Sequence, residues 1–204
     1  YRLLDSTEEP RLVAVFEGAG TMDPDRDGLS PWLFERCTNR RKGDGSPLED
    51  ATKAALLHAA QEVPGAMAHL AEGAGPLDRV AALCGAAERL RFLNATCHRE
   101  LFTKEVRWTA EEARRTRDGL DLATFEMGPA EVLGMQVASD PEAIALIRRW
   151  KAGSTFTDLS GPAIRSSSAV VCISMPRMDR PHALLAGRAM ERVWLRATAL
   201  GLAV

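Results

Sequence analysis

The sequence predicts an α+β fold that is rich in helices. Several segments begin with a polar capping residue followed by an acidic residue or a proline, and amphipathic periodicity follows them. Two other segments are short, rich in apolar residues that favour strands, and bounded by turn residues. Strands and helices do not alternate as β-α-β units, and this order indicates an α+β arrangement.

The first two helices are expected in the second quarter of the chain. Ser46-Pro47-Leu48-Glu49 is a capping box with proline at the first helical position, and its helix should run to about Glu62. Gly75-Pro76 opens the next helix, which is expected to reach His98 or Glu100. Its apolar stripe is predicted at Leu77, Val80, Leu83, Cys84, Ala87, Leu90, Leu93 and Cys97.

Two more capping boxes predict helices in the middle of the chain. Thr109-Ala110-Glu111-Glu112 begins a helix that should stop near Gly119. Ser139-Asp140-Pro141-Glu142 begins another, which Gly153 closes.

The last helix is predicted to be long. Pro181 occupies its first turn, and Gly201 follows Leu200 as its C-terminal stop. Its apolar side should consist of Leu184, Leu185, Ala189, Val193, Trp194, Ala197 and Leu200.

Two strands are predicted. Residues 11–16 form a short β-rich run, and residues 169–175 are almost continuously apolar. A continuous apolar run is typical of a strand that is buried on both faces. Residues 18–28 contain several glycine and aspartate residues and form the segment with the strongest flexible-loop composition.

The bulk composition excludes several classes of protein. The chain has 204 residues, 46% of them hydrophobic and 26% charged, and its formal net charge is -2. This balance is ordinary for a soluble globular protein and gives no field that would attract nucleic acid or an anionic lipid surface. No apolar run approaches the length of a membrane span. The cysteines, which we expect to be reduced thiols, indicate a cytoplasmic protein. Both ends resemble cuts, and we expect a piece of a longer polypeptide.

The residues that usually carry catalysis or bind metals do not form a recognisable pattern. The four cysteines (Cys37, Cys84, Cys97 and Cys172) lack metal-site spacing and are expected to be reduced and mostly buried. The sequence has no nucleophile elbow, no phosphate-binding loop with lysine and no complete dinucleotide fingerprint. The catalytic residues are therefore unknown, and no metal site is predicted. An enzyme of this kind would rely on a bound cofactor.

The segment Arg36-Cys37-Thr38-Asn39-Arg40-Arg41 is the strongest candidate binding site. A guanidinium group holds a phosphate through paired hydrogen bonds, and a hydroxyl adds another contact. The alternative is an ordinary solvated basic helix end. An apolar stretch precedes the segment, at Leu29 and Pro31-Trp32-Leu33-Phe34, and we expect it to anchor the segment to a core.

Three segments resemble the nitroreductase family of flavin-dependent oxidoreductases. Arg36-Cys37-Thr38-Asn39-Arg40 is similar to the family's Arg-x-Ser/Thr-x-Arg/Lys motif. Residues 185–203, with an Ala-Gly-x-Ala start and an Ala-Thr-x-x-Gly-Leu end, resemble its long central helix. Glu105-Val106-Arg107-Trp108 and Arg117-Asp118-Gly119-Leu120 resemble a middle segment of the branch that carries Thr-Asn-Arg-Arg. The family's Pro-Ser-x-x-Asn-x-Gln-Pro-Trp segment has no counterpart here.

The resemblance implies a nitroreductase-like fold, a central, mostly antiparallel sheet wrapped by helices. Residues 31–204 would form this domain, shortened at its C-terminus, and residues 1–30 would be a linker or the end of a preceding half-domain. FMN would lie at the interface of a homodimer or an intrachain pseudo-dimer. Arg36, Thr38, Arg40 and the neighbouring Arg41 would bind its phosphate and ribityl chain, with Cys37 contributing through its backbone. An upstream adenylating domain is a further partner that the resemblance implies.

Three functions remain open at this stage. The first is an FMN-dependent NAD(P)H oxidoreductase that reduces nitroaromatics, quinones or related small-molecule acceptors. The second is a flavin-binding or storage protein without turnover. The third is a degenerate domain that serves as a dimerisation or docking surface in a larger enzyme.

Overall fold

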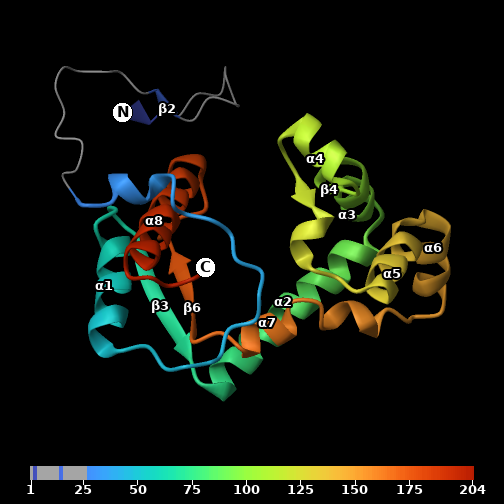
Figure 1. Ribbon diagram of the computed structural model, residues 1–204, viewed down its shortest axis with the longest axis horizontal. Coiled ribbons are helices and arrows are strands. Elements are labelled where there is room, and N and C mark those ends of the chain that lie inside the picture. Colours follow the sequence, from blue (N-terminus) through green and yellow to red (C-terminus); the bar gives the residue numbers. More distant parts are fainter. Residues whose placement is uncertain (1, 4–13, 16–26) are drawn as a thin grey trace. The chain divides into compact units, whose positions relative to one another are not determined.

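The computed structural model describes residues 2–3, 14–15 and 27–204 and shows a helix-rich α+β protein (Figure 1). The α+β prediction is confirmed at this level. The chain divides into two compact units. The first unit draws on residues 1–39, 47–71 and 169–204, and the second on residues 40–46 and 72–168.

The described elements of the first unit are β1 (Arg2–Leu3), β2 (Ala14–Val15), the 3-10 helix η1 (Ser30–Leu33), α1 (Asp50–Gln61), β3 (Met67–Glu72), β6 (Ala169–Ser174) and α8 (Arg180–Ala199). β1 pairs with β2 in an antiparallel register. β3 pairs with β6, and Figure 1 draws their arrows in opposite directions. Most of the predicted strand at residues 11–16 and of the predicted loop at residues 18–28 lies outside the described residues.

Contacts between α1 and α8 form the core of the first unit. The buried side chains come mainly from these two helices and are Leu56, Ala59, Ala60, Val63, Ala66, Ala189, Val193 and Ala197. Many of them are alanines, which let two helix backbones approach closely because no long side chain separates them. Here the sequence prediction was confirmed in part. Ala189, Val193 and Ala197 of the predicted apolar side of α8 belong to this cluster, and Leu185 packs against it. Leu200, which was also predicted on this side, is 43% exposed because it follows the last residue of the helix.

A half-buried arginine reinforces the contact between α1 and α8. The Arg192 guanidinium pairs with Glu62, just after α1, and with Asp27. Its Nε also donates to the carbonyl oxygen of Ala59 at 3.3 Å. The hydrogen bond from Arg192 lowers the pKa of Asp27 below its ordinary value. One side chain of α8 thus joins two other segments of the chain.

The prediction that β6 is buried on both faces was wrong. Val171 and Ile173 pack against the core that α1 and α8 form, whereas Cys172 and Ser174 are exposed. The physical reason is that, among the described residues, the core between α1 and α8 covers one face of this small sheet, so side chains alternate between the two environments.

The described elements of the second unit are α2 (Ala74–Leu93), α3 (Ala95–Glu100), the π-helix η2 (Leu101–Glu105), β4 (Val106–Arg107), α4 (Ala110–Thr116), β5 (Leu120–Asp121), the 3-10 helix η3 (Leu122–Phe125), α5 (Pro129–Ser139), α6 (Pro141–Arg149), the 3-10 helix η4 (Ser154–Thr157) and α7 (Gly161–Arg165). β4 and β5 pair in parallel.

Aromatic side chains fill the core of the second unit. Phe92 stacks on Phe156 with ring centroids 4.5 Å apart, and it meets Phe102 edge to face at 5.9 Å. Phe102 lies 6.1 Å from Trp108. Such pairs add to the free energy gained by burying the rings, which makes this cluster the main apolar contact of the unit.

Several predicted helix starts differ from the observed ones. Thr109 caps α4 as predicted, since its side chain accepts from the backbone N–H of Glu112. α1 begins later than its predicted capping box, with Glu49 as N-cap and no side-chain cap. α6 is capped by Asp140, one residue after the predicted serine.

The predicted helix from Gly75 to about residue 100 is interrupted. Asn94 ends α2 and caps α3, because its side chain accepts from the backbone N–H groups of Thr96 and Cys97. The predicted stripe was wrong in part, since Leu83 and Leu90 are 73% and 69% exposed. The buried face of α2 is instead Leu77, Ala81, Gly85 and Phe92.

Other elements were not predicted. They include β3, α5 and the π-helix η2. The described strands form three two-stranded sheets instead of one larger central sheet. β4 and β5 are only two residues long, too short for periodicity to reveal them from sequence.

The four cysteines carry free thiols, but the expectation that most are buried was wrong. Cys37, Cys97 and Cys172 are exposed, and Cys84 is half-buried.

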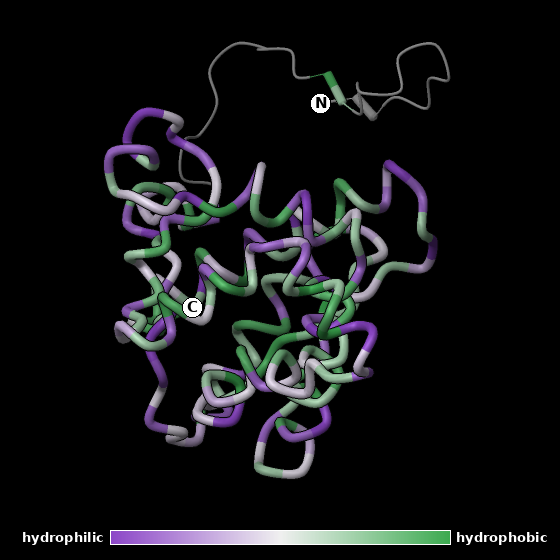
Figure 2. Tube along the Cα trace, turned by 90° about the vertical axis from the view of Figure 1, so that its right-hand side faces the viewer, coloured by the Kyte–Doolittle hydropathy of each residue, from purple (hydrophilic) through white to green (hydrophobic). Residues whose placement is uncertain are grey.

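In Figure 2 hydrophobic and hydrophilic residues alternate along the chain. Within the described residues no helix combines the length and hydrophobicity that crossing a membrane requires.

Two glycines provide a matched test of the packing in the second unit. A Cβ atom on Gly85 of α2 would overlap the carbonyl oxygen of Thr157 in η4 and lie 2.8 Å from its carbonyl carbon. Gly85→Ala should therefore lower the free energy of unfolding by about 1–3 kcal/mol. A Cβ atom on Gly134 of α5 would meet no atom within 4 Å, so Gly134→Ala should raise the free energy of unfolding by about 0.5–1 kcal/mol. Urea denaturation measures both changes, and a stabilising Gly85→Ala would contradict this packing.

Candidate functional site

The basic segment lies in the connection between η1 and α1, not on a helix end. Leu29, the residue before η1, is the buried part of the predicted apolar anchor, because it is only 3% exposed. The rest of the predicted apolar anchor is less buried, since Leu33 and Phe34 are 48% and 96% exposed. Burial of Leu29 therefore anchors the chain before η1, whereas the basic segment itself crosses the surface.

Arg36 is held against α8. Its Nε lies 2.9 Å from Glu191 Oε1, and its guanidinium carbon lies 4.3 Å from the centre of the Trp194 ring. The Nε atom is buried but has no partner in hydrogen-bond geometry among the described residues, so the contact with Glu191 is an ion pair and not an aligned hydrogen bond. The ion pair and the cation–π contact fix the position of this guanidinium.

Arg40 and Arg41 make their contacts in the second unit, around η3. The Arg40 guanidinium lies 4.9 Å from the centre of the Phe125 ring. Arg41 pairs with Glu126, with Nη2 2.8 Å from Oε1. Their hydrogen bond raises the pKa of Arg41 and lowers the pKa of Glu126. Both side chains are mostly exposed, so solvent screens this pair and it adds little to stability.

Cys37 and Thr38 are both exposed. The backbone N–H of Asn39 donates to the carbonyl oxygen of Val204 at 2.6 Å, which ties the segment to the residues after α8. Within the described residues, the structure thus places Arg36 on α8 and places Arg40 and Arg41 at η3, in different units. The predicted site residues do not converge on one point in a single unit.

Arg36 fits a phosphate group best among these residues. Its contact with Glu191 is made by Nε, and the terminal nitrogens carry most of the guanidinium's donors. Thr38 can add a hydroxyl two residues further on. Arg165, the last residue of α7, is a weaker candidate for binding a phosphate, because its guanidinium already forms ion pairs with Asp78 and Asp158.

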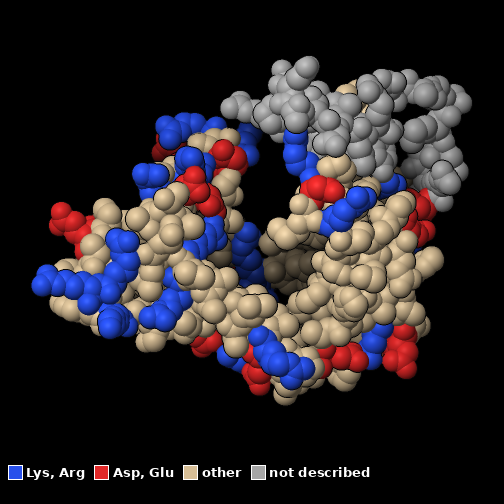
Figure 3. Space-filling view, turned by 180° about the vertical axis from the view of Figure 1, so that it is seen from behind, with Lys and Arg blue, Asp and Glu red and all other residues tan. Residues whose placement is uncertain are grey.

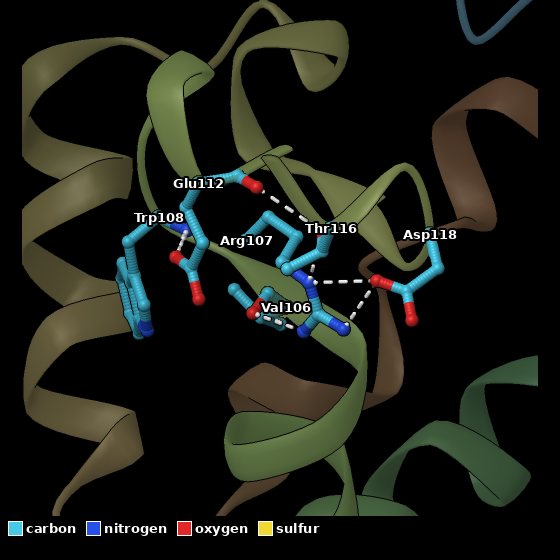
Figure 4. A network of polar contacts seen from close by, with 6 residues as sticks. All are labelled: Val106, Arg107, Trp108, Glu112, Thr116 and Asp118. Atoms are coloured by element: carbon cyan, nitrogen blue, oxygen red, sulfur yellow. Dashed lines mark hydrogen bonds and ion pairs between the residues drawn. The ribbon is translucent and has the colours of Figure 1, made fainter. Parts of the chain in front are cut away.

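A second polar cluster joins two of the segments that carry the family resemblance (Figure 4). Arg107 is only 7% exposed, and its guanidinium donates to Asp118 Oδ1 from Nη2 at 2.7 Å and from Nε at 3.1 Å. Nε also donates to Thr116 Oγ1, and Nη1 to the Val106 carbonyl oxygen. Sequence reasoning noted both segments but did not predict that these side chains meet.

Local backbone geometry places Asp118 beside Arg107. Arg117 ends α4 in the left-handed region, and Gly119 has a φ of 76°. A Cβ atom on Gly119 would overlap the Glu105 carbonyl oxygen and lie 3.0 Å from the guanidinium carbon of Arg107. Glycine is therefore required for this turn, which brings β5 alongside β4. The hydrogen bonds of Arg107 with Thr116 and Asp118 therefore connect β4 to the end of α4 and to the turn before β5, and we call these three residues the clamp.

Removing the clamp should destabilise the second unit. Arg107→Met deletes a buried guanidinium that makes several charge-assisted hydrogen bonds, so the free energy of unfolding should fall by about 1.5–3 kcal/mol. Arg115→Met on α4 is the control, because this arginine is exposed. Equal stability of the two variants in urea denaturation would contradict the clamp.

The clamp should also depend on pH. The hydrogen bonds from Arg107 and Thr116 hold the pKa of Asp118 below its ordinary value of 3.8. A lowered carboxyl pKa stabilises the folded state above the unfolded pKa and loses this effect as the pH falls through the folded pKa. The stability difference between wild type and Arg107→Met should therefore narrow between about pH 5 and about pH 2. A difference that stays constant over this range would show that the ion pair is unimportant.

Comparisons with known proteins identify one similar protein and no family. The chain is 27% identical over 211 aligned positions to a protein of Mycobacterium tuberculosis (strain CDC 1551 / Oshkosh) described as uncharacterized protein MT1398. The alignment covers the whole of this chain but only 29% of that protein's length. No family model matches the chain, and no solved structure matches it.

Proposed function

We propose that this chain is part of an FMN-dependent NAD(P)H oxidoreductase of the nitroreductase type. One observation carries the proposal. The basic segment and the α8 helix, the two segments most similar to that family, are about 150 residues apart in sequence and lie in contact. Arg36 pairs with Glu191, and Asn39 binds the Val204 backbone.

The position of Arg36 suits the capture of a phosphate dianion. Trp194 supports one face of the guanidinium and Glu191 approaches its Nε, so few conformations are lost when a ligand binds. A guanidinium held in this way retains its terminal N–H donors for two phosphate oxygens. Thr38 would donate its hydroxyl to a third oxygen.

The remaining roles follow the same chemistry. Cys37 would contribute its backbone N–H, whereas Arg40, which was predicted to bind FMN, contacts Phe125 in the second unit and is left out of the proposed site. Arg41 pairs with Glu126 in the second unit and is left out as well. When bound, FMN accepts a hydride from NAD(P)H and passes it to a nitroaromatic, a quinone or a related small molecule.

The proposal extends to the assembly. A flavin site with one basic segment is completed in a nitroreductase-like fold by a second half, either a second copy of the chain or another part of the same polypeptide. The chain spans 29% of the length of its relative, which leaves room for such a half and for an upstream adenylating domain. We propose a cytoplasmic location for this enzyme.

A docking domain without flavin is the alternative that a specific observation favours. Arg36 and Arg41 are both paired with carboxylates, as arginines with a purely structural role would be. In this alternative the segment joins structural elements and no phosphate is bound. A flavin-storage protein would share the FMN site but lack turnover.

Substitution of Arg36 distinguishes these functions. In the full chain, Arg36→Ala should weaken FMN binding by about 1.5–3 kcal/mol, because it removes a charge-assisted contact with the phosphate. Quenching of flavin fluorescence measures the affinity. Oxidation of NADH or NADPH in the presence of a quinone then separates an enzyme from a storage protein.

Arg177→Ala is the matched control. This arginine belongs to the first unit, its side chain is 74% exposed, and it pairs with Asp179. Its loss should leave FMN affinity unchanged. A wild-type chain that binds no FMN, or an Arg36→Ala variant with unchanged affinity, would refute the flavin site and support the docking domain.

A further inference from the structure

We propose that a cavity in the second unit binds a small organic anion with an apolar body. The cavity has a volume of about 260 Å³ and lies among α3, the π-helix η2 and the start of α6. Volumes of about 300–1,000 Å³ are typical for drug-sized ligands, so this cavity suits a smaller molecule. It is separate from the flavin site proposed above, since it includes none of those residues.

The walls of the cavity are apolar. Ala95 and Phe102 line it from the α3 and η2 side, and Pro141 and Ile144 line it from α6. Ile144 is only 1% exposed, so this wall is fixed by packing. An apolar ligand body would displace water from these surfaces and gain free energy in proportion to the area covered.

A rare backbone form shapes one side of the cavity. Phe102 and Thr103 belong to the π-helix, which interrupts the regular i to i−4 hydrogen bonding after α3. Single-turn π-helices are uncommon and occur often at functional sites. His98, one turn earlier, also lines the cavity and is only 5% exposed. Its Nε2 lies within hydrogen-bond distance, 2.8 Å, of the Ala138 carbonyl oxygen.

Two arginines supply the charge. Arg99 and Arg148 line the cavity, and neither guanidinium has a hydrogen bond or ion pair within the described part of the chain. The nearby carboxylates are occupied elsewhere, since Glu100 pairs with Lys104 and Asp140 caps α6. No aspartate or glutamate lines the cavity. Figure 3 shows both basic and acidic side chains over this unit, so the positive charge that would attract an anion is local to Arg99 and Arg148.

The hydroxyl groups at the cavity do not compete for this role. Thr103 donates to the Arg99 carbonyl oxygen at 2.7 Å, and Ser139 donates to the Gln136 carbonyl oxygen at 2.7 Å. Their protons are therefore used, and the two guanidiniums are the donors left for an anion. Charge next to an apolar wall selects a carboxylate or phosphate that is attached to a ring or a short aliphatic chain.

Titration of the full chain with benzoate, benzyl alcohol and inorganic phosphate tests this assignment. Isothermal calorimetry or ligand-observed NMR should give benzoate the highest affinity, because it alone combines the charge with the ring. Arg99→Gln and Arg148→Gln should each weaken benzoate binding by about tenfold, the loss expected for one charge-assisted hydrogen bond. Arg149→Gln is the control, since this exposed neighbour on α6 does not line the cavity.

A second variant tests the cavity without changing charge. Ala95→Trp fills the space from the first residue of α3 and should abolish benzoate binding, whereas Ala110→Trp at the first residue of α4 should not. The proposal is overturned if wild type binds no benzoate, if phosphate binds as tightly as benzoate, or if Ala95→Trp retains full affinity.

Discussion

The contact of α8 with α1 is the interaction on which the first unit depends. The two helices supply most of its buried side chains, and the β3–β6 sheet packs one face against them. Arg192 adds an ionic connection from α8 to Glu62 and Asp27. The Arg192 side chain is 14% exposed, and the side chains of Glu62 and Asp27 are 38% and 36% exposed. Since the unit is assembled from three stretches of sequence, this helix pair is what holds distant segments together.

The same helix positions the candidate flavin contact. Glu191 and Trp194 are three residues apart, so they lie on one side of α8 and meet Arg36 together. Residues such as Val193 point to the core and keep this side of the helix fixed in space. In the second unit the aromatic cluster around Phe92 has the equivalent role, because it fixes α2 and η2 and thereby the walls of the anion cavity.

Much of the helical framework is visible in the sequence, because capping residues and apolar periodicity act locally. Thr109 and the buried face of α8 show this well. The predicted apolar stripe of α2 shows the limit of periodicity as a guide. Gly85 lets η4 approach α2 closely, so the small residues on that side of the helix are buried and Leu83 stays exposed. The contacts Arg36–Glu191 and Arg107–Asp118 depend on tertiary packing or on a turn geometry that no periodic pattern encodes.

The central claim is that Arg36, held on α8, recognises the phosphate of a flavin. A comparison of FMN with riboflavin tests it most directly, since the two ligands differ only by that phosphate. The full chain should bind FMN at least about tenfold more tightly than riboflavin, and Arg36→Gln should remove most of this preference. Equal affinity for the two flavins, or a preference that survives Arg36→Gln, would contradict the account.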